Sequence, residues 1–252
     1  MRVFFVGAGP GDPELLTRRA ERLLRSCRFC IYAGSLVSPE VLALLPADAE
    51  THDSAALSLE QTTALCLKAR ERGLDVVRLH SGDPSIYGAI GEQMGELDAA
   101  GVDYEVIPGV SSFQAAAAAL RTELTAPEVS QTVILSRVAD RTPVPQEQEL
   151  GELARTHATL CLFLSVHKIE SIARTLTPHY GADCPAAVVY RVSWPDQQII
   201  SGTLADIAAK AAVAGINKTA LIFVGRALGR GLPASKLYDA RFSHGHRRGT
   251  PE

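Results

Sequence analysis

The residues with the clearest chemical potential form a glycine-rich run, GAGPGDPELLT, at positions 7–17, directly after the apolar stretch RVFFV. Asp12 and Pro13 suit the start of a helix, and the backbone N–H groups at such a start often bind phosphate. Here, however, Pro10 removes one donor, and the carboxylate of Asp12 would repel a phosphate. The spacing G-x-G-x-G therefore predicts close backbone approach to a cationic or zwitterionic ligand.

Two further loops of small residues follow apolar stretches, HSGDPSIYGAI at positions 80–90 and PGVSS at positions 108–112. Gly82 permits tight passage of the backbone, and Asp83 offers a carboxylate. Ser111 and Ser112 offer hydroxyls at the start of a helix. Turn glycines and a capping serine would explain each loop alone. Because ligands bind beyond the carboxyl ends of strands in open α/β sheets, the three loops together predict one shared site.

Near-continuous apolar runs predict strands that are buried on both faces. These runs lie at positions 2–6, 29–32, 75–79, 103–107, 132–135, 159–164, 186–190 and 220–224. Helical patterns fall between them, at positions 13–26, 58–73, 86–100, 113–120, 147–156, 168–177 and 203–214. This alternation predicts an α/β fold with mainly parallel strands.

The chain length and the positions of its loops predict two α/β domains with a cleft between them. The expected bounds are 1–115 for an N-terminal domain with the glycine-rich loops, 116–232 for a C-terminal domain, and 233–252 for a tail. The N-terminal sheet should be mainly parallel. The run QIIS after Trp194-Pro195-Asp196 suggests a hairpin, so the C-terminal sheet should be mixed. Clefts between domains are favoured ligand sites.

Composition excludes several classes of protein. Lys and Arg number 25 against 28 Asp and Glu, so the net charge of −3 argues against a nucleic-acid partner. No apolar run reaches the ~18 residues that span a membrane, and no signal peptide is visible, so we expect a cytoplasmic protein. Cys27 and Cys30 form an isolated C-x-x-C without a second pair, and the histidines lack ligand spacing. We therefore expect buried thiols and no metal site.

Taken in order, GAGPGDPELLT, SGDPSIYG and PGVSS resemble the tetrapyrrole methylase family. The resemblance implies two α/β domains, usually a homodimer, and S-adenosyl-L-methionine as the methyl donor, with S-adenosyl-L-homocysteine as its product. Three further motifs, YAGSLVSPEVL, YRVSWPDQQIISGTL and SKLYDARFSHGHRR, are similar to a subgroup that methylates C11 of precorrin-4 in cobalamin biosynthesis. The similarity runs from position 2 to about position 248, which is essentially the whole chain.

The resemblance also implies a set of site residues. The implied cofactor contacts are Pro10, Ser81, Gly82, Asp83, Ile86, Tyr87, Ser111, Ser112, Leu164, Val192, Thr219, Ala220 and Leu221. Leu164 stands where relatives often carry methionine, and Val192 where some have glycine. Because precorrins carry many carboxylates, Arg191 is a candidate substrate contact, together with Tyr32 and Ser35. Candidate catalytic residues, which the sequence does not rank, are Asp12, Asp83 and His80.

A methyl group on a sulfonium ion is already activated, so its transfer to an electron-rich carbon needs positioning in a water-poor cleft and no nucleophilic triad. Alternative substrates are the cobalt complex of precorrin-4, uroporphyrinogen III, ribosomal RNA and the diphthamide precursor. The acidic balance and the subgroup motifs disfavour the last two. A nucleotide-dependent oxidoreductase is disfavoured by Pro10, by the glycine spacing, and by Ala33-Gly34 where an acidic residue would stand. A binding protein without catalytic activity is a further alternative.

Overall fold

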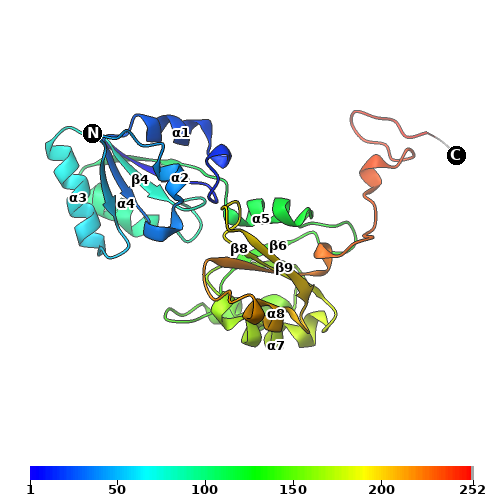
Figure 1. Cartoon of the computed structure of the whole chain (residues 1–252). Helices are drawn as coiled ribbons and strands as arrows, with labels where there is room; N and C mark the ends of the chain where they lie inside the picture. The colour runs from blue at the N-terminus through cyan, green and yellow to red at the C-terminus, as the bar shows by residue number, and fades with distance from the viewer. Residues whose placement is uncertain (251–252) are drawn as a thin grey trace. The chain divides into compact units, whose positions relative to one another are not determined.

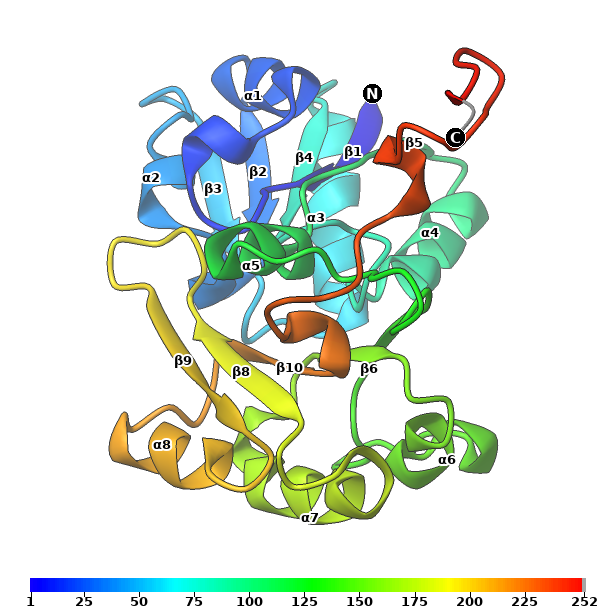
Figure 2. The same ribbon diagram turned by 90° about the vertical axis from the view of Figure 1, so that its right-hand side faces the viewer.

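The computed structural model describes residues 1–250 and divides into two compact units (Figures 1 and 2). The first unit contains Met1–Ala116 together with Arg191–Gln197, and the second contains Ala117–Tyr190 and the chain from Gln198 onward. The short segment Arg191–Gln197 therefore groups with the first unit, although it connects two strands of the second. No helix within residues 1–250 is long and apolar enough to cross a membrane.

The first unit is built on a five-stranded sheet in the order β3-β2-β4-β1-β5, in which every neighbouring pair is parallel. Its strands are β1 (Arg2–Gly7), β2 (Phe29–Tyr32), β3 (Glu50–Asp53), β4 (Val76–His80) and β5 (Asp103–Ile107). The helices α1 (Arg18–Arg25) and α2 (Pro39–Leu42) pack on one face, and α3 (Leu59–Glu71) and α4 (Ile90–Ala99) pack on the other. Burial on both faces explains the near-continuous apolar strands.

The second unit has a mixed five-stranded sheet in the order β6-β7-β10-β8-β9. Its strands are β6 (Val133–Ser136), β7 (Thr159–Leu162), β8 (Pro185–Tyr190), β9 (Gln198–Thr203) and β10 (Ala220–Val224). Only the β6–β7 pair is parallel, and β8 and β9 form the predicted hairpin. The helices α6 (Leu150–Ala154), α7 (Ile169–Tyr180) and α8 (Ile207–Val213) cover one face of this sheet (Figure 2). The predicted fold class is confirmed in both units.

Several predicted elements differ from the observed ones. The helix expected at 13–26 is broken into a 3-10 turn, η1 (Pro13–Leu15), and α1, because Thr17 caps a new helix by accepting a hydrogen bond from Ala20 N at 3.1 Å. The helix expected at 86–100 begins only at Ile90, after a tight turn. The strand β3 was not predicted, because its sequence ETHD is polar and part-exposed.

The remaining short elements complete the topology. They are α5 (Ser112–Leu120), η2 (Gly34–Leu36), η3 (Gln146–Gln148), η4 (Val166–Lys168), η5 (Arg226–Leu228) and η6 (Lys236–Tyr238). All five cysteines are free and buried, as the sequence predicts, and burial raises the pKa of the Cys161 thiol to about 12. Such thiols act as small apolar side chains in the two cores.

Candidate functional site

The loops that follow β1, β4 and β5 meet at the carboxyl edge of the first sheet, because these three parallel strands are neighbours. Gly82 N donates a hydrogen bond to Gly9 O at 2.8 Å, and Gly9 N donates to Gly82 O at 3.2 Å. A Cβ atom on Gly7 would lie 2.6 Å from the Cα of Gly109, and a Cβ atom on Gly109 would collide with Gly82 O. The structure thus brings together the three loops that the sequence singled out, with backbone packed directly against backbone.

Asp83 fastens the second loop to the third. Its Oδ2 accepts a hydrogen bond from Gly109 N at 2.9 Å, and its Oδ1 accepts from Ser85 N at 2.8 Å and from the Ser85 hydroxyl. Partial burial raises the pKa of Asp83, but the hydrogen bonds from Ser85 and Gly109 outweigh this effect and lower its pKa below the usual value. Asp83 is therefore a weak proton acceptor with both oxygens engaged.

In the first glycine-rich loop, several backbone N–H groups are hydrogen-bonded within the protein. Ala8 N donates to the carbonyl at the end of β4 at 2.7 Å, and Gly9 N is used in the bridge described above. Asp12 N donates to the Ser193 hydroxyl at 3.0 Å. The Asp12 carboxylate accepts from Glu14 N at 2.9 Å, which confirms it as the cap of the following turn. Three amides that a phosphate cradle could use here, those of Ala8, Gly9 and Asp12, are therefore taken within the protein.

The segment Arg191–Gln197 packs on this same loop. Trp194 Nε1 donates to Pro10 O at 2.9 Å, and a Cβ atom on Gly11 would collide with the Trp194 indole ring. Arg191 stacks its guanidinium 4.8 Å from the centre of that ring and pairs with Asp196 at 2.8 Å. The sequence indicates that Trp194-Pro195-Asp196 precedes a hairpin strand. The structure adds a contact of Trp194 with the first loop, at Pro10 and Gly11.

The other predicted positions of the first unit differ in exposure. Ser111 is buried, whereas Tyr87 is 45% exposed. Tyr32 ends β2, one strand further along the same edge, and Ser35 is exposed in the turn that follows it. Ser81, Ile86 and Ser112 are half-buried, and Val192 is buried.

His80 ends β4 but lies within the protein, at 4% exposure. Within residues 1–250 its Nε2 atom has no hydrogen-bond partner. Burial, with a smaller effect from the neighbouring Arg78 cation, lowers the pKa of His80 to about 3. This candidate catalytic residue is therefore a neutral, enclosed imidazole near pH 7.

The second unit carries the remaining predicted cofactor positions at one edge of its sheet. In the antiparallel pair β7–β10, Leu162 at the end of β7 is opposite Ile222 of β10, so Leu164 follows and Thr219 precedes these strands at the same edge of the sheet. Leu164 is 64% exposed and has a φ of +55°, and Thr219 has a φ of +52°. This edge thus presents the exposed apolar side chain of Leu164, whereas the side chain of Leu221 is buried.

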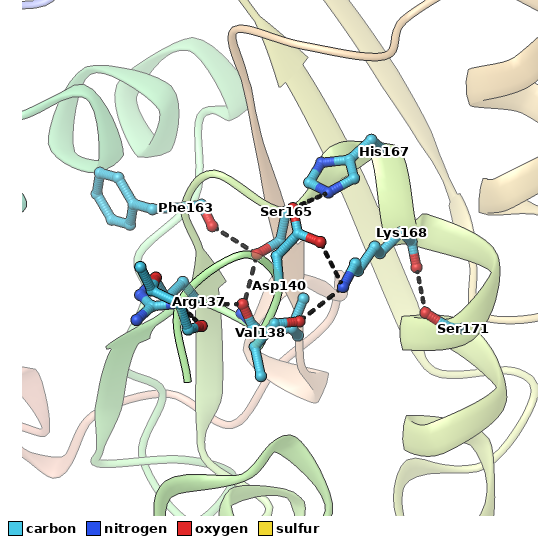
Figure 3. A network of polar contacts seen from close by, with 10 residues as sticks. Arg137, Val138, Asp140, Phe163, Ser165, His167, Lys168 and Ser171 are labelled. Atoms are coloured by element: carbon cyan, nitrogen blue, oxygen red, sulfur yellow. Dashed lines mark hydrogen bonds and ion pairs between the residues drawn. The ribbon is translucent and has the colours of Figure 1, made fainter. Parts of the chain in front are cut away.

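A polar network holds the turn that carries this exposed leucine (Figure 3). Ser165 is fully buried, and its hydroxyl donates to Phe163 O at 2.7 Å and accepts from Val138 N at 3.0 Å. Lys168 donates to the carbonyl of residue 139 at 2.7 Å and pairs with Asp140 at 2.9 Å. The loops after β6 and β7 are therefore tied together.

A parallel α/β unit with three interlocked loops and a second unit with a mixed sheet define the class of fold. Residues 2–208 match the family model for Tetrapyrrole (Corrin/Porphyrin) Methylases. The chain belongs to the tetrapyrrole methylase family, as its motifs indicate.

Similar proteins cover almost the whole chain. It is 51% identical to the precorrin-4 C(11)-methyltransferase of Pseudomonas aeruginosa, with 99% of this chain and 100% of the relative covered. It is 49% identical to the cobalt-precorrin-4 C(11)-methyltransferase of Methanocaldococcus jannaschii, with 98% and 96% covered.

Two solved structures of similar proteins agree with this assignment. The X-ray structure of a cobalt precorrin-4 methyltransferase of cobalamin biosynthesis matches with a TM-score of 0.88 and 41% identity, covering 90% of this chain and 96% of that one. The uroporphyrin-III C-methyl transferase of Thermus thermophilus, solved in complex with S-adenyl homocysteine, matches with a TM-score of 0.76 and 31% identity. It covers 90% of this chain and 93% of its own.

The contact of the three loops predicts that Gly109→Ala destabilises the protein by about 1–3 kcal/mol, because the added methyl group collides with backbone that has no room to move. The matched control is Gly95→Ala in the middle of α4, where an added Cβ meets nothing within 4 Å. This control should stabilise the protein by about 0.5–1 kcal/mol. Thermal and urea unfolding measure both effects, and equal stability of the two variants would contradict the packing described.

The buried imidazole predicts a pH dependence of stability. The unfolded chain takes up a proton at His80 near pH 6.5, whereas the folded protein does so only near pH 3, so folding is progressively disfavoured as the pH falls between these values. At pH 5 the cost is about 2 kcal/mol. We expect the melting temperature of His80→Gln to fall less than that of the wild type when the pH is lowered from 7 to 5. The exposed control His246→Gln should behave as the wild type, and an unchanged slope in His80→Gln would contradict the prediction.

Proposed function

We propose that this protein transfers a methyl group from S-adenosyl-L-methionine to C11 of precorrin-4, giving precorrin-5 in cobalamin biosynthesis. The observation that carries the proposal is the 51% identity, over 250 residues, to an enzyme that is named for this reaction. The solved relative in complex with S-adenyl homocysteine supports the choice of methyl donor.

The loops of the first unit fit such a cofactor. Gly7 and Gly109 let the backbone of the three loops approach more closely than a side chain at either position would allow. The cofactor carries a sulfonium and an ammonium group but no phosphate, which agrees with a loop whose donors are used internally and which bears the Asp12 carboxylate. When bound, it supplies a methyl group that is already activated toward a carbon nucleophile.

The proposed cofactor contacts in the first unit are Pro10, Ser81, Gly82, Asp83, Ile86, Tyr87, Ser111, Ser112 and Val192, and those in the second are Leu164, Thr219, Ala220 and Leu221. Leu164 exposes an apolar side chain, which suits contact with the cofactor and exclusion of water.

The residues of this chain contribute mainly by holding the reactants in place. Asp83 is a weak base that is fully occupied in fastening loops, and His80 is neutral and enclosed. Neither suits a proton acceptor near pH 7, since general bases work best with a pKa close to the operating pH. Rigid loops that orient the methyl group in line with the acceptor carbon would instead supply the rate enhancement.

For the substrate, we propose contacts from Arg191, Tyr32 and Ser35. The guanidinium of Arg191 is held by Trp194 and Asp196 and stays part-exposed, which suits it to bind a peripheral carboxylate of the macrocycle. Relatives named for metal-free and for cobalt-bound precorrin-4 are 51% and 49% identical to the chain, so cobalt-precorrin-4 is the second candidate substrate. A homodimer, which the family resemblance implies, and the cytoplasmic location expected from the sequence complete the proposal.

Methyl transfer from S-adenosylmethionine with a labelled methyl group, assayed side by side on precorrin-4 and its cobalt complex, tests the proposal. We expect one labelled methyl group at C11, located by NMR and mass spectrometry of the product. No transfer to either substrate by folded protein would contradict it.

The variant Gly82→Val tests whether the second loop contributes to methyl transfer. Gly82 has a φ of +62°, so valine there is strained and we expect a loss of activity of at least about tenfold. Gly101→Val is the matched control, because Gly101 has the same φ of +62° but lies outside the three loops with open space around it. Equal activity of both variants, with circular dichroism as a check of folding, would remove the second loop from the site.

A further inference from the structure

The second loop ends in a strained turn before α4. Tyr87 and Ala89 have φ values of +55° and +49°, in the left-handed region that side chains other than glycine rarely adopt. A Cβ atom on Gly88, which lies between them, would collide with Pro84 O. Ala89 stands at the N-cap of α4 and provides no side-chain cap. Such a turn persists only when its surroundings hold it in place.

Two consecutive hydrogen bonds, which link the sheet to this turn, supply the restraint. Arg78 of β4 is 8% exposed, and its Nε donates to Gln93 Oε1 of α4 at 2.9 Å. Gln93 Nε2 in turn donates to Ala89 O at 2.9 Å. The amide orientation is determined by its partners, because a guanidinium only donates and a carbonyl only accepts. Arg78 is itself fixed by a bond from its Nη1 to Ile31 O at 3.4 Å.

We propose that Arg78 and Gln93 are positioning residues for the cofactor, an inference that rests on the proposed function. Asp83 holds the start of the second loop by its bond to Gly109, and Gln93 holds the end of this loop. Between these two fixed points lie Ile86 and Tyr87, both proposed cofactor contacts. Tyr87 is 45% exposed.

The variant Gln93→Glu distinguishes a role in positioning the cofactor from a role in stability alone. The carboxylate still accepts from Arg78, and it forms an ion pair with that buried cation, so the folded state keeps this contact. The ionised side chain has no proton to donate, so the side-chain bond to Ala89 O is lost and the end of the loop has one restraint fewer. We expect a melting temperature no lower than that of the wild type, together with about tenfold weaker binding of S-adenosylhomocysteine in calorimetry. The KM for S-adenosylmethionine should rise to a similar extent.

Two companion variants complete the experiment. Gln148→Glu makes the same substitution at an exposed position of the second unit and should bind as the wild type does. Gln93→Met removes both bonds, leaves the buried Arg78 Nε without an acceptor, and should lower both the melting temperature and the affinity. If Gln93→Glu does not fold, Gln93→Met answers the same question about the end of the loop.

The possible outcomes are distinct. If the wild type binds S-adenosylhomocysteine and a folded Gln93 variant binds it equally well, the inference is overturned and the proposed function stands. If the wild type itself does not bind the ligand, the proposed function fails. Weaker binding by Gln93→Glu with an unchanged melting temperature supports the positioning role.

Discussion

The site depends on one physical constraint, the direct contact of backbone with backbone among Gly7, Gly82 and Gly109. These glycines lie in the loops after three neighbouring parallel strands, and a Cβ atom on Gly7 or Gly109 would meet main-chain atoms that have no room to retreat. The bridge between Gly9 and Gly82 then links the first two loops, and Asp83 fastens the third. The result is a rigid edge whose shape follows from the absence of side chains.

This constraint also bears on the charge of the ligand that we propose for the site. Because the loops bond to one another, the amides of Ala8, Gly9 and Asp12 are used within the protein, and fewer donors are left for a phosphate. Trp194 covers the outer side of the first loop through Pro10 O, and Asp12 adds negative charge beside it. The proposed cofactor, which carries positive charge and no phosphate, agrees with these contacts and with membership of the methylase family.

Much of this arrangement could be predicted from the sequence, because it depends on local signals. Apolar runs indicated most of the strands, the run QIIS after Trp194-Pro195-Asp196 indicated a hairpin and hence a mixed second sheet, and the three loops stood out by their glycines. Contacts between distant residues could not be read in this way. The packing of Trp194 on Gly11 joins positions 183 residues apart, β3 is polar, and Arg78 is a buried charge inside an otherwise apolar strand. Nor does helical periodicity reveal that the 83–89 turn delays the start of α4.

The most direct test of the account compares two ligands on the wild-type protein by isothermal titration calorimetry. S-adenosylhomocysteine, which has no phosphate, should bind with a measurable heat and a stoichiometry of one per chain. NADH, whose pyrophosphate needs free loop amides, should give no binding heat under the same conditions. Tight binding of NADH without binding of S-adenosylhomocysteine would contradict the central claim that the interlocked glycine loops form a site for a cofactor without phosphate.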